Sequence, residues 1–224
     1  MGLNYEYEVI VRNVKNPRIE INAKGNVKVI VPPSQDPEDI IKKKRAWIES
    51  KLNELEQIKK QFGPLSSKFL FNGDFYSLIQ GEDFFVNPKF KVVSLPHGDF
   101  KVLKKWLKDR LREELDFKVR LFASIMDVRY RKVYIRFQKT KWASCSKKGN
   151  LSFNLALMAL PEGLRDYVII HELAHLRIPK HGDEFWGLVK TYYPDYVEAK
   201  KRLRVFWLLL EWNEVWQNLR EVKV

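Results

Sequence analysis

The stretch His171-Glu172-Leu173-Ala174-His175, which continues through Pro179 to His181, organises the chain. The chain has only four histidines, and three of them fall within these eleven residues. An α-helix turns about 100° per residue, so side chains at positions i and i+4 project from one face about 6 Å apart. His171 and His175 have this spacing, and the pair can therefore share one metal ion.

Glu172 indicates a catalytic metal site, because it lies one position round the helix from the two histidines. Two imidazoles that bind zinc, beside a carboxylate that acts as general base on a metal-bound water, are typical of the zincins. We therefore predict a zinc-dependent metallopeptidase that hydrolyses peptide bonds in peptides or proteins, with Glu172 as the catalytic residue. A thiol protease built on Cys145 would leave the spacing of the histidines and Glu172 unexplained.

The segment after this helix is expected to supply the third metal ligand. The helix should open at Pro161 and end at Pro179, because proline disfavours helical geometry at the preceding residue and lacks an N–H. The chain then turns back and carries His181 toward the metal. Glu198 is the alternative third ligand, as in gluzincins, whereas Ile178 and the absence of a downstream methionine exclude a metzincin.

Two strands are predicted directly upstream of the helix that carries His171 and His175, called the metal helix below. Residues 133–138 and 151–157 alternate with period two and are separated by the turn residues 147–150. This pattern predicts an antiparallel hairpin, one strand of which could hold an extended peptide by main-chain hydrogen bonds. Candidate contacts to the substrate or the transition state are Lys141, Trp142, Ser152, Asn154, Tyr167, Tyr192 and Tyr193.

The whole chain is predicted to have an α+β fold with two parts. Residues 1–96 form an N-terminal β-rich subdomain, in which strands at 5–11, 17–21 and 27–31 make a small antiparallel meander and a basic helix spans about 37–60. Residues 97–224 form a zincin-like catalytic domain with a long amphipathic helix, the hairpin and the metal helix. The turn Pro96-His97-Gly98 marks the expected boundary.

The amino-acid composition indicates the cellular compartment and the kinds of partner that the protein could bind. The net charge of +13 favours attraction to phosphate backbones, acidic peptides or anionic surfaces, with Lys42, Lys43, Lys44 and Arg45 as the candidate nucleic-acid contact. A single cysteine allows no intramolecular disulfide, and residues 205–210, the longest apolar-rich run, are too short to span a bilayer. We expect a cytoplasmic protein without a membrane span.

The C-terminal run after Pro194 is rich in aromatic residues at helical spacing, including Trp207, Trp212 and Trp216. Its apolar stripe is too broad for a lone exposed helix, so packing against the core is the first expectation. A homodimer contact or a base-stacking platform through this C-terminal aromatic helix is the alternative.

Several short motifs agree with the histidine segment in order and spacing. They are Lys141-Trp142-Ala143-Ser144-Cys145-Ser146 with Gly149-Asn150, then Asp166-Tyr167, and His181 with Phe185-Trp186. Together they resemble the YgjP-like metallopeptidase domain family, which lies near the SprT-like proteases, and the likeness covers most of the chain. The resemblance implies a zincin-type α+β fold with His171, His175 and His181 as ligands and Glu172 as base.

The loop around Trp142 departs from the pattern of that family, which has arginine and glycine where this chain has Lys141 and Ala143. The positive charge is kept, but the bidentate guanidinium and the backbone freedom of glycine are lost.

Two other functions are compatible with the metal and the charge. One is a metal-dependent hydrolase of nucleotide phosphoanhydrides, against which stands the absence of an acidic cluster for magnesium. The other is a nucleic-acid-associated protease, by analogy with the SprT-like proteases, that uses the basic surface.

Overall fold

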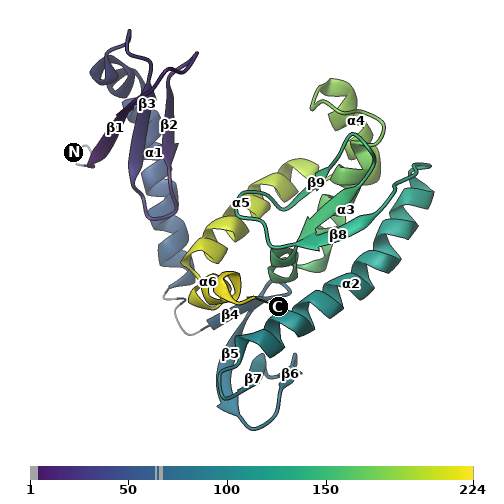
Figure 1. Ribbon diagram of the computed structural model, residues 1–224. Coiled ribbons are helices and arrows are strands. Elements are labelled where there is room, and N and C mark those ends of the chain that lie inside the picture. Colours follow the sequence, from purple (N-terminus) through teal and green to yellow (C-terminus); the bar gives the residue numbers. More distant parts are fainter. Residues whose placement is uncertain (1–4, 64, 66–67, 224) are drawn as a thin grey trace. The chain divides into compact units, whose positions relative to one another are not determined.

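The computed structural model of the protein describes residues 5–63, 65 and 68–223. This part of the chain contains six α-helices and three small sheets with both parallel and antiparallel pairs, which confirms a mixed α+β fold (Figure 1). The chain divides into two compact units, residues 1–64 and residues 65–224. None of the helices among the described residues combines the length and the apolar character needed to cross a membrane.

The first unit is a three-stranded sheet packed against one long helix. Its strands are β1 (Tyr7–Val11), β2 (Arg18–Ile21) and β3 (Val27–Val31), and its helix is α1 (Pro37–Phe62), close to the predicted bounds. Side chains alternate along a strand, so Val27, Val29 and Val31 share one face, where they form a buried cluster with Ile48 of α1. Asp36 caps α1 by accepting a hydrogen bond from the N–H of Glu38 at 3.0 Å.

The strand order of this sheet, β1-β3-β2, corrects the predicted meander. β2 is antiparallel to β3, but β1 is parallel to β3 and lies on its other side. An alternating pattern of apolar residues marks a strand without saying which neighbour it pairs with. β1 consequently pairs with the third strand of the chain and not with the next one.

The second unit begins with a four-stranded sheet in the order β4-β5-β7-β6, in which only β5 and β7 are parallel. Trp216, near the C-terminus of the chain, is fully buried and donates its indole N–H to the carbonyl of Leu70 at 2.8 Å. Residues 68–96, which the sequence places in the N-terminal subdomain, therefore belong to the compact unit that contains the metal helix. The strands are β4 (Lys68–Phe71), β5 (Asp74–Gly81), β6 (Phe85–Asn87) and β7 (Val92–Pro96).

The predicted long helix is α2 (Phe100–Ile125), and it packs against α3 (Glu162–Ala174), the helix that carries His171 (Figure 1). Leu103, Leu107, Leu111 and Leu115 of α2 are almost wholly buried. Ion pairs of two buried cations, Lys118 and Arg165, tie the two helices together. Lys118 of α2 lies 2.5 Å from Asp166 and 2.7 Å from Glu162, and Glu114 lies 2.7 Å from Arg165. Since unpaired buried charges are costly, these pairs hold α3 in one orientation on α2.

The sheet beside α3 differs from the predicted hairpin. It contains β8 (Val133–Arg136), β9 (Ala143–Cys145) and β10 (Leu151–Asn154) in the order β8-β10-β9. β8 and β10 are parallel, and the antiparallel partner of β10 is β9. With only three residues, β9 is too short to show a period-two pattern, and residues 155–159 form a 3-10 helix instead of extending β10.

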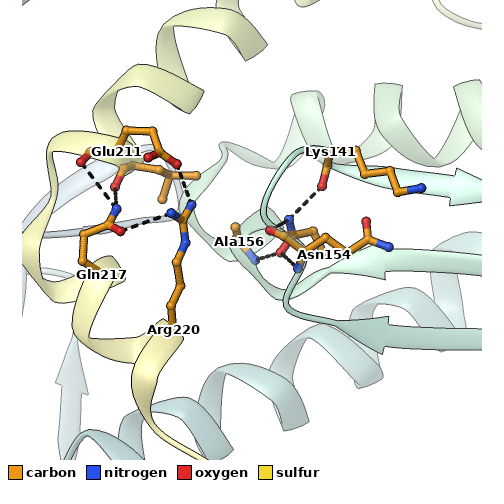
Figure 2. Close-up of polar contacts among 8 residues, drawn as sticks. Lys141, Asn154, Ala156, Glu211, Gln217 and Arg220 are labelled. Atoms are coloured by element: carbon orange, nitrogen blue, oxygen red, sulfur yellow. Dashed lines mark hydrogen bonds and ion pairs between the residues drawn. The ribbon is translucent and has the colours of Figure 1, made fainter. Parts of the chain in front are cut away.

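The C-terminal part consists of α4 (Asp183–Tyr192), α5 (Tyr196–Trp212) and α6 (Glu214–Glu221). The predicted aromatic helix is divided at Asn213, which caps α6 by accepting a hydrogen bond from the N–H of Trp216. The corner between α5 and α6 is held by Arg220, which lies 2.8 Å from Glu211 and donates to Gln217 at 3.1 Å (Figure 2). Core packing therefore accounts for the buried part of the apolar stripe, Leu203, Leu209, Leu210, Val215, Trp216 and Leu219.

Candidate metal centre

Helix α3 and the residue that follows it place His171 and His175 on one face. The helix ends at Ala174, five residues before Pro179, so the prediction that proline ends it is wrong. Tight turns close the helix instead, as the N–H of Leu176 donates to the carbonyl of Leu173. His175 still has helical dihedral angles, φ −64° and ψ −18°, and so keeps the i, i+4 relation to His171.

The three histidines converge at the end of α3. One ring nitrogen from each of His171, His175 and His181 can be chosen so that all three lie within 4.8 Å of one another. The Nε2 atoms of His171 and His181 are 3.1 Å apart. Two nitrogens on a tetrahedral zinc, each about 2.0–2.1 Å from the metal, lie about 3.3–3.4 Å apart. The donor set and its spacing therefore fit a single metal ion.

His175 is oriented by the backbone that follows it. Its Nδ1 lies 3.2 Å from the carbonyl oxygen of Ile178, so the protonated Nδ1 donates there and Nε2 keeps its lone pair for a metal. Phe185 of α4 is fully buried and lies against all three imidazoles, with ring centroids 5.0, 4.5 and 4.7 Å from those of His171, His175 and His181. One aromatic ring thus supports the whole cluster.

Burial favours the neutral form of His171 and His175. The pKa of His171 is lowered to about 3, mainly by burial and to a smaller extent by the nearby His175 and His181. The pKa of His175 is also lowered by burial, although the hydrogen bond to Ile178 opposes this shift. Neutral imidazole is the form that binds metal. In the described part of the chain, the buried Nδ1 of His171 has no hydrogen-bond partner.

Glu172 is only 6% exposed, and burial raises the pKa of its carboxyl group to about 7. The positive charge of Lys141 and the backbone N–H of Cys145, which donates to the carboxylate, both oppose this shift. Burial of Cys145, together with the charge of Glu172, raises the pKa of the Cys145 thiol to about 11. At neutral pH the thiol is protonated, which argues against the thiol-protease alternative.

His181 lies on an exposed segment between two helices, and aromatic side chains hold its ring. Trp186 stacks on it with ring centroids 5.4 Å apart and an angle of 17° between the planes. Tyr196 of α5 stacks on Trp186 at 5.2 Å, and the ammonium of Lys200 lies 4.0 Å from the centre of the indole. This column joins α4 and α5 to the third histidine.

Asn154, a predicted substrate contact, is fully buried at the end of the central strand β10. Its Nδ2 donates to the carbonyls of Gln138 at 2.9 Å and Lys141 at 2.8 Å, and its Oδ1 accepts from the N–H of Ala156 at 3.1 Å (Figure 2). These bonds occupy both polar groups of the side chain. Asn154 therefore fixes the loop that carries Lys141 and has no free donor for a substrate.

The other predicted contacts lie at various distances from the cluster. Lys141 is exposed and acts on Glu172 by its charge, whereas Trp142 packs edge-on against Trp207 of α5 at 4.9 Å. Tyr167 is buried between His171 and Tyr193, with ring centroids 5.9 and 5.3 Å away, and burial raises the pKa of its hydroxyl. Ser152 lies part-buried on β10, and Tyr192 part-buried at the end of α4.

Glu198, the alternative third ligand, is not part of the histidine cluster among the described residues. It is exposed on α5 and lies 3.4 Å from Lys201. Sequence reasoning missed the carbonyl of Ile178 and the N–H of Cys145, which orient His175 and Glu172. Backbone groups carry no residue-type signal, so no pattern in the sequence identifies them.

Comparison with known proteins identifies the family of the chain. The model of the YgjP-like metallopeptidase domain matches residues 15–206. The chain belongs to the YgjP-like metallopeptidase family. A metallopeptidase is a hydrolase that needs a metal ion and acts on peptides or proteins, and the three-histidine cluster offers a place for that ion.

Solved structures offer a more limited likeness, and no curated protein matches the chain. The metallopeptidase zymogen of Pyrococcus abyssi abylysin is 28% identical, with a TM-score of 0.37, and the match covers 40% of this chain and 90% of that one. The metallopeptidase zymogen of Methanocaldococcus jannaschii jannalysin is 25% identical, with a TM-score of 0.36, over 40% of this chain and 92% of that one.

Proposed function

We propose that this metallopeptidase is a zinc-dependent zincin, with His171, His175 and His181 as the metal ligands. The observation that carries the proposal is the convergence of three imidazoles beside one buried carboxylate. Three nitrogen ligands are the donor set of a catalytic zinc with an open fourth position. Zinc bound there would polarise a water molecule and the carbonyl group of the scissile peptide bond.

Glu172 acts as the general base in this proposal. Glu172 directly follows the ligand His171 in the sequence. Its carboxyl group is buried beside β9, and this burial raises the pKa of the group to about 7. A base of this pKa accepts a proton from the attacking water near neutral pH and passes it to the leaving amine. Lys141, whose charge acts on Glu172, is a candidate partner for the oxyanion that develops on the substrate.

Metal analysis and peptide hydrolysis, measured on the same preparations, test the proposal. Glu172→Gln should keep its zinc and lose hydrolysis, because the amide cannot accept the proton. His175→Ala should lose both. Glu184→Gln is the matched control, since Glu184 is exposed in the first turn of α4, and it should retain both. Full hydrolysis by the Glu172→Gln variant would refute the mechanism.

The third ligand has a separate test. His181→Ala should lower the zinc content markedly, while Glu198→Ala should leave it unchanged, because Glu198 lies outside the cluster. The opposite pattern, with zinc lost only from the Glu198→Ala variant, would assign the site to the gluzincin class.

A further inference from the structure

The segment that leads into the metal centre has an unusual distribution of charge. No acidic residue occurs between Asp127 and Glu162, although the whole chain has 28 acidic residues against 41 basic ones. The same interval contains eight basic residues, and all eight side chains are exposed. They are Arg129, Arg131, Lys132, Arg136, Lys139, Lys141, Lys147 and Lys148.

These cations are also unpaired. Within the described residues, no carboxylate lies within ion-pair distance of any of the eight, in contrast to Lys118 of α2 and Arg165 of α3. Arg136 lies over the ring of Tyr134 at 5.6 Å, and Lys141 acts on Glu172 through its charge. An anionic ligand would therefore meet positive charge that is not already neutralised.

Part of this basic segment borders the catalytic carboxylate. Lys139 and Lys141 precede β9, and Lys147 and Lys148 follow it in the turn to β10. That turn lies against the end of α3, because a Cβ on Gly149 would be 3.6 Å from Leu176, the residue after His175. Basic residues thus stand at both ends of β9, the strand whose Cys145 N–H donates to Glu172.

The outer edge of β9 faces the site. In the antiparallel ladder, the carbonyl of Trp142 accepts from Asn154 and the N–H of Ser146 donates to Asn150, so these residues point their backbone groups toward β10. Ala143 and Cys145 alternate with them and point theirs outward. The hydrogen bond from the Cys145 N–H to Glu172 agrees with this direction. An extended chain along this edge would pair with the outward backbone groups of Ala143 and with the carbonyl of Cys145, beside the catalytic carboxylate that accepts from the Cys145 N–H.

We propose, on the basis of the proposed function, that the enzyme selects acidic polypeptide segments. The substrate lies extended along the outer edge of β9, where backbone hydrogen bonds hold it without regard to sequence. Asp or Glu side chains on either side of the scissile bond then meet Lys139 and Lys141 at one end, and Lys147 and Lys148 at the other. A peptide is favoured over a nucleic acid because only a peptide offers backbone amides to a strand edge.

Matched synthetic peptides test the selectivity. They share one scissile bond and differ only in whether the flanking positions carry Glu, Gln or Lys. At low salt, the Glu peptide should have a kcat/KM at least about 10-fold above that of the Gln peptide, and the Lys peptide should be worst. The advantage should shrink as salt is added, because exposed charges are screened. Equal rates for the Glu and Gln peptides at low salt would overturn the proposal.

Charge-reversal variants show which lysines cause the preference for Glu peptides. The double variant Lys147→Glu/Lys148→Glu should lose the preference for Glu peptides and keep its zinc. Lys42→Glu/Lys43→Glu, in α1 of the other unit, changes the net charge equally and should keep the preference. If both double variants lose it equally, the selectivity is a property of the net charge alone, and the assignment to β9 is wrong.

Binding to the zinc-loaded Glu172→Gln variant separates this proposal from the proposed function. Fluorescence anisotropy with the labelled Glu and Gln peptides and a labelled single-stranded oligonucleotide reports recognition without hydrolysis. Tighter binding of the Glu peptide supports the selectivity even if the wild type cleaves no peptide, in which case only the proposed function fails. Binding of the oligonucleotide alone would overturn the peptide assignment.

Discussion

The sheet of the first unit and the sheet beside the histidines share one pairing pattern. In both β1-β3-β2 and β8-β10-β9, the central strand is parallel to one neighbour and antiparallel to the other. Both central strands also bury their apolar side chains, as Val29 of β3 and Phe153 of β10 illustrate. Among the described residues, however, the cluster of metal-ligating side chains lies only beside the second sheet.

The difference shows that backbone pairing positions a site but does not create one. In the sheet β8-β10-β9, the outward N–H of Cys145 donates to the carboxylate of Glu172, and the buried side-chain amide of Asn154 fixes the loop that carries Lys141. The central strand of the first sheet has valine and isoleucine at its buried positions. Substitutions in the two sheets should therefore have different consequences.

The largest expected effect is that of removing a histidine. His171→Ala should lower zinc affinity by more than about 100-fold, above the range usual for residues that only support a ligand. Zinc competition with a chromophoric chelator measures the affinity. The same measurement on Val29→Ala, in the other sheet, should give the wild-type value. Wild-type affinity in His171→Ala would show that the ion binds elsewhere.

Asn154→Leu should destabilise the second unit by about 3 kcal/mol, because it leaves two carbonyls and two backbone N–H groups without their partners. Chemical denaturation followed by near-ultraviolet circular dichroism reports this change. Ser152→Ala is the control two residues earlier on the same strand, and it should cost less than about 1 kcal/mol. Equal stability of the two variants would show that Asn154 does not hold the loop.

A smaller effect is expected in the first sheet. Val29→Ala removes two buried methyl groups and should weaken the first unit by about 2 kcal/mol. Hydrogen exchange at the amides of β3 and α1 should become faster, while exchange in α3 and the zinc content stay unchanged. Loss of zinc from this variant would contradict the separation of the two sheets.

The smallest effect concerns the support of His181. Trp186→Leu removes the ring that stacks on the imidazole and should weaken zinc binding about 10-fold. Trp186→Phe keeps an aromatic surface and should restore most of the affinity. If the leucine and phenylalanine variants bind zinc equally, stacking does not position the histidine.

The metal cluster could be predicted from the sequence because its information is local. The i, i+4 spacing of His171 and His175 needs only helical geometry, and the short return to His181 needs only a turn. The pairing of β8 with β10 depends on contacts between distant segments, and the three residues of β9 are too few for a periodic signal. The role of Asn154 depends on backbone carbonyls, which have no signature in the sequence.

The contact between Trp216 and β4 has a consequence for biosynthesis. Trp216, in the last helix, packs on Phe69 and Phe137 with ring centroids 5.8 and 5.9 Å away, and it bonds to Leu70 in the first strand of its unit. Protein chains are made from the N-terminus, and domains fold as units during synthesis. The first unit is synthesised before these residues, whereas the contacts of Trp216 in the metallopeptidase core can form only after α6 has been translated.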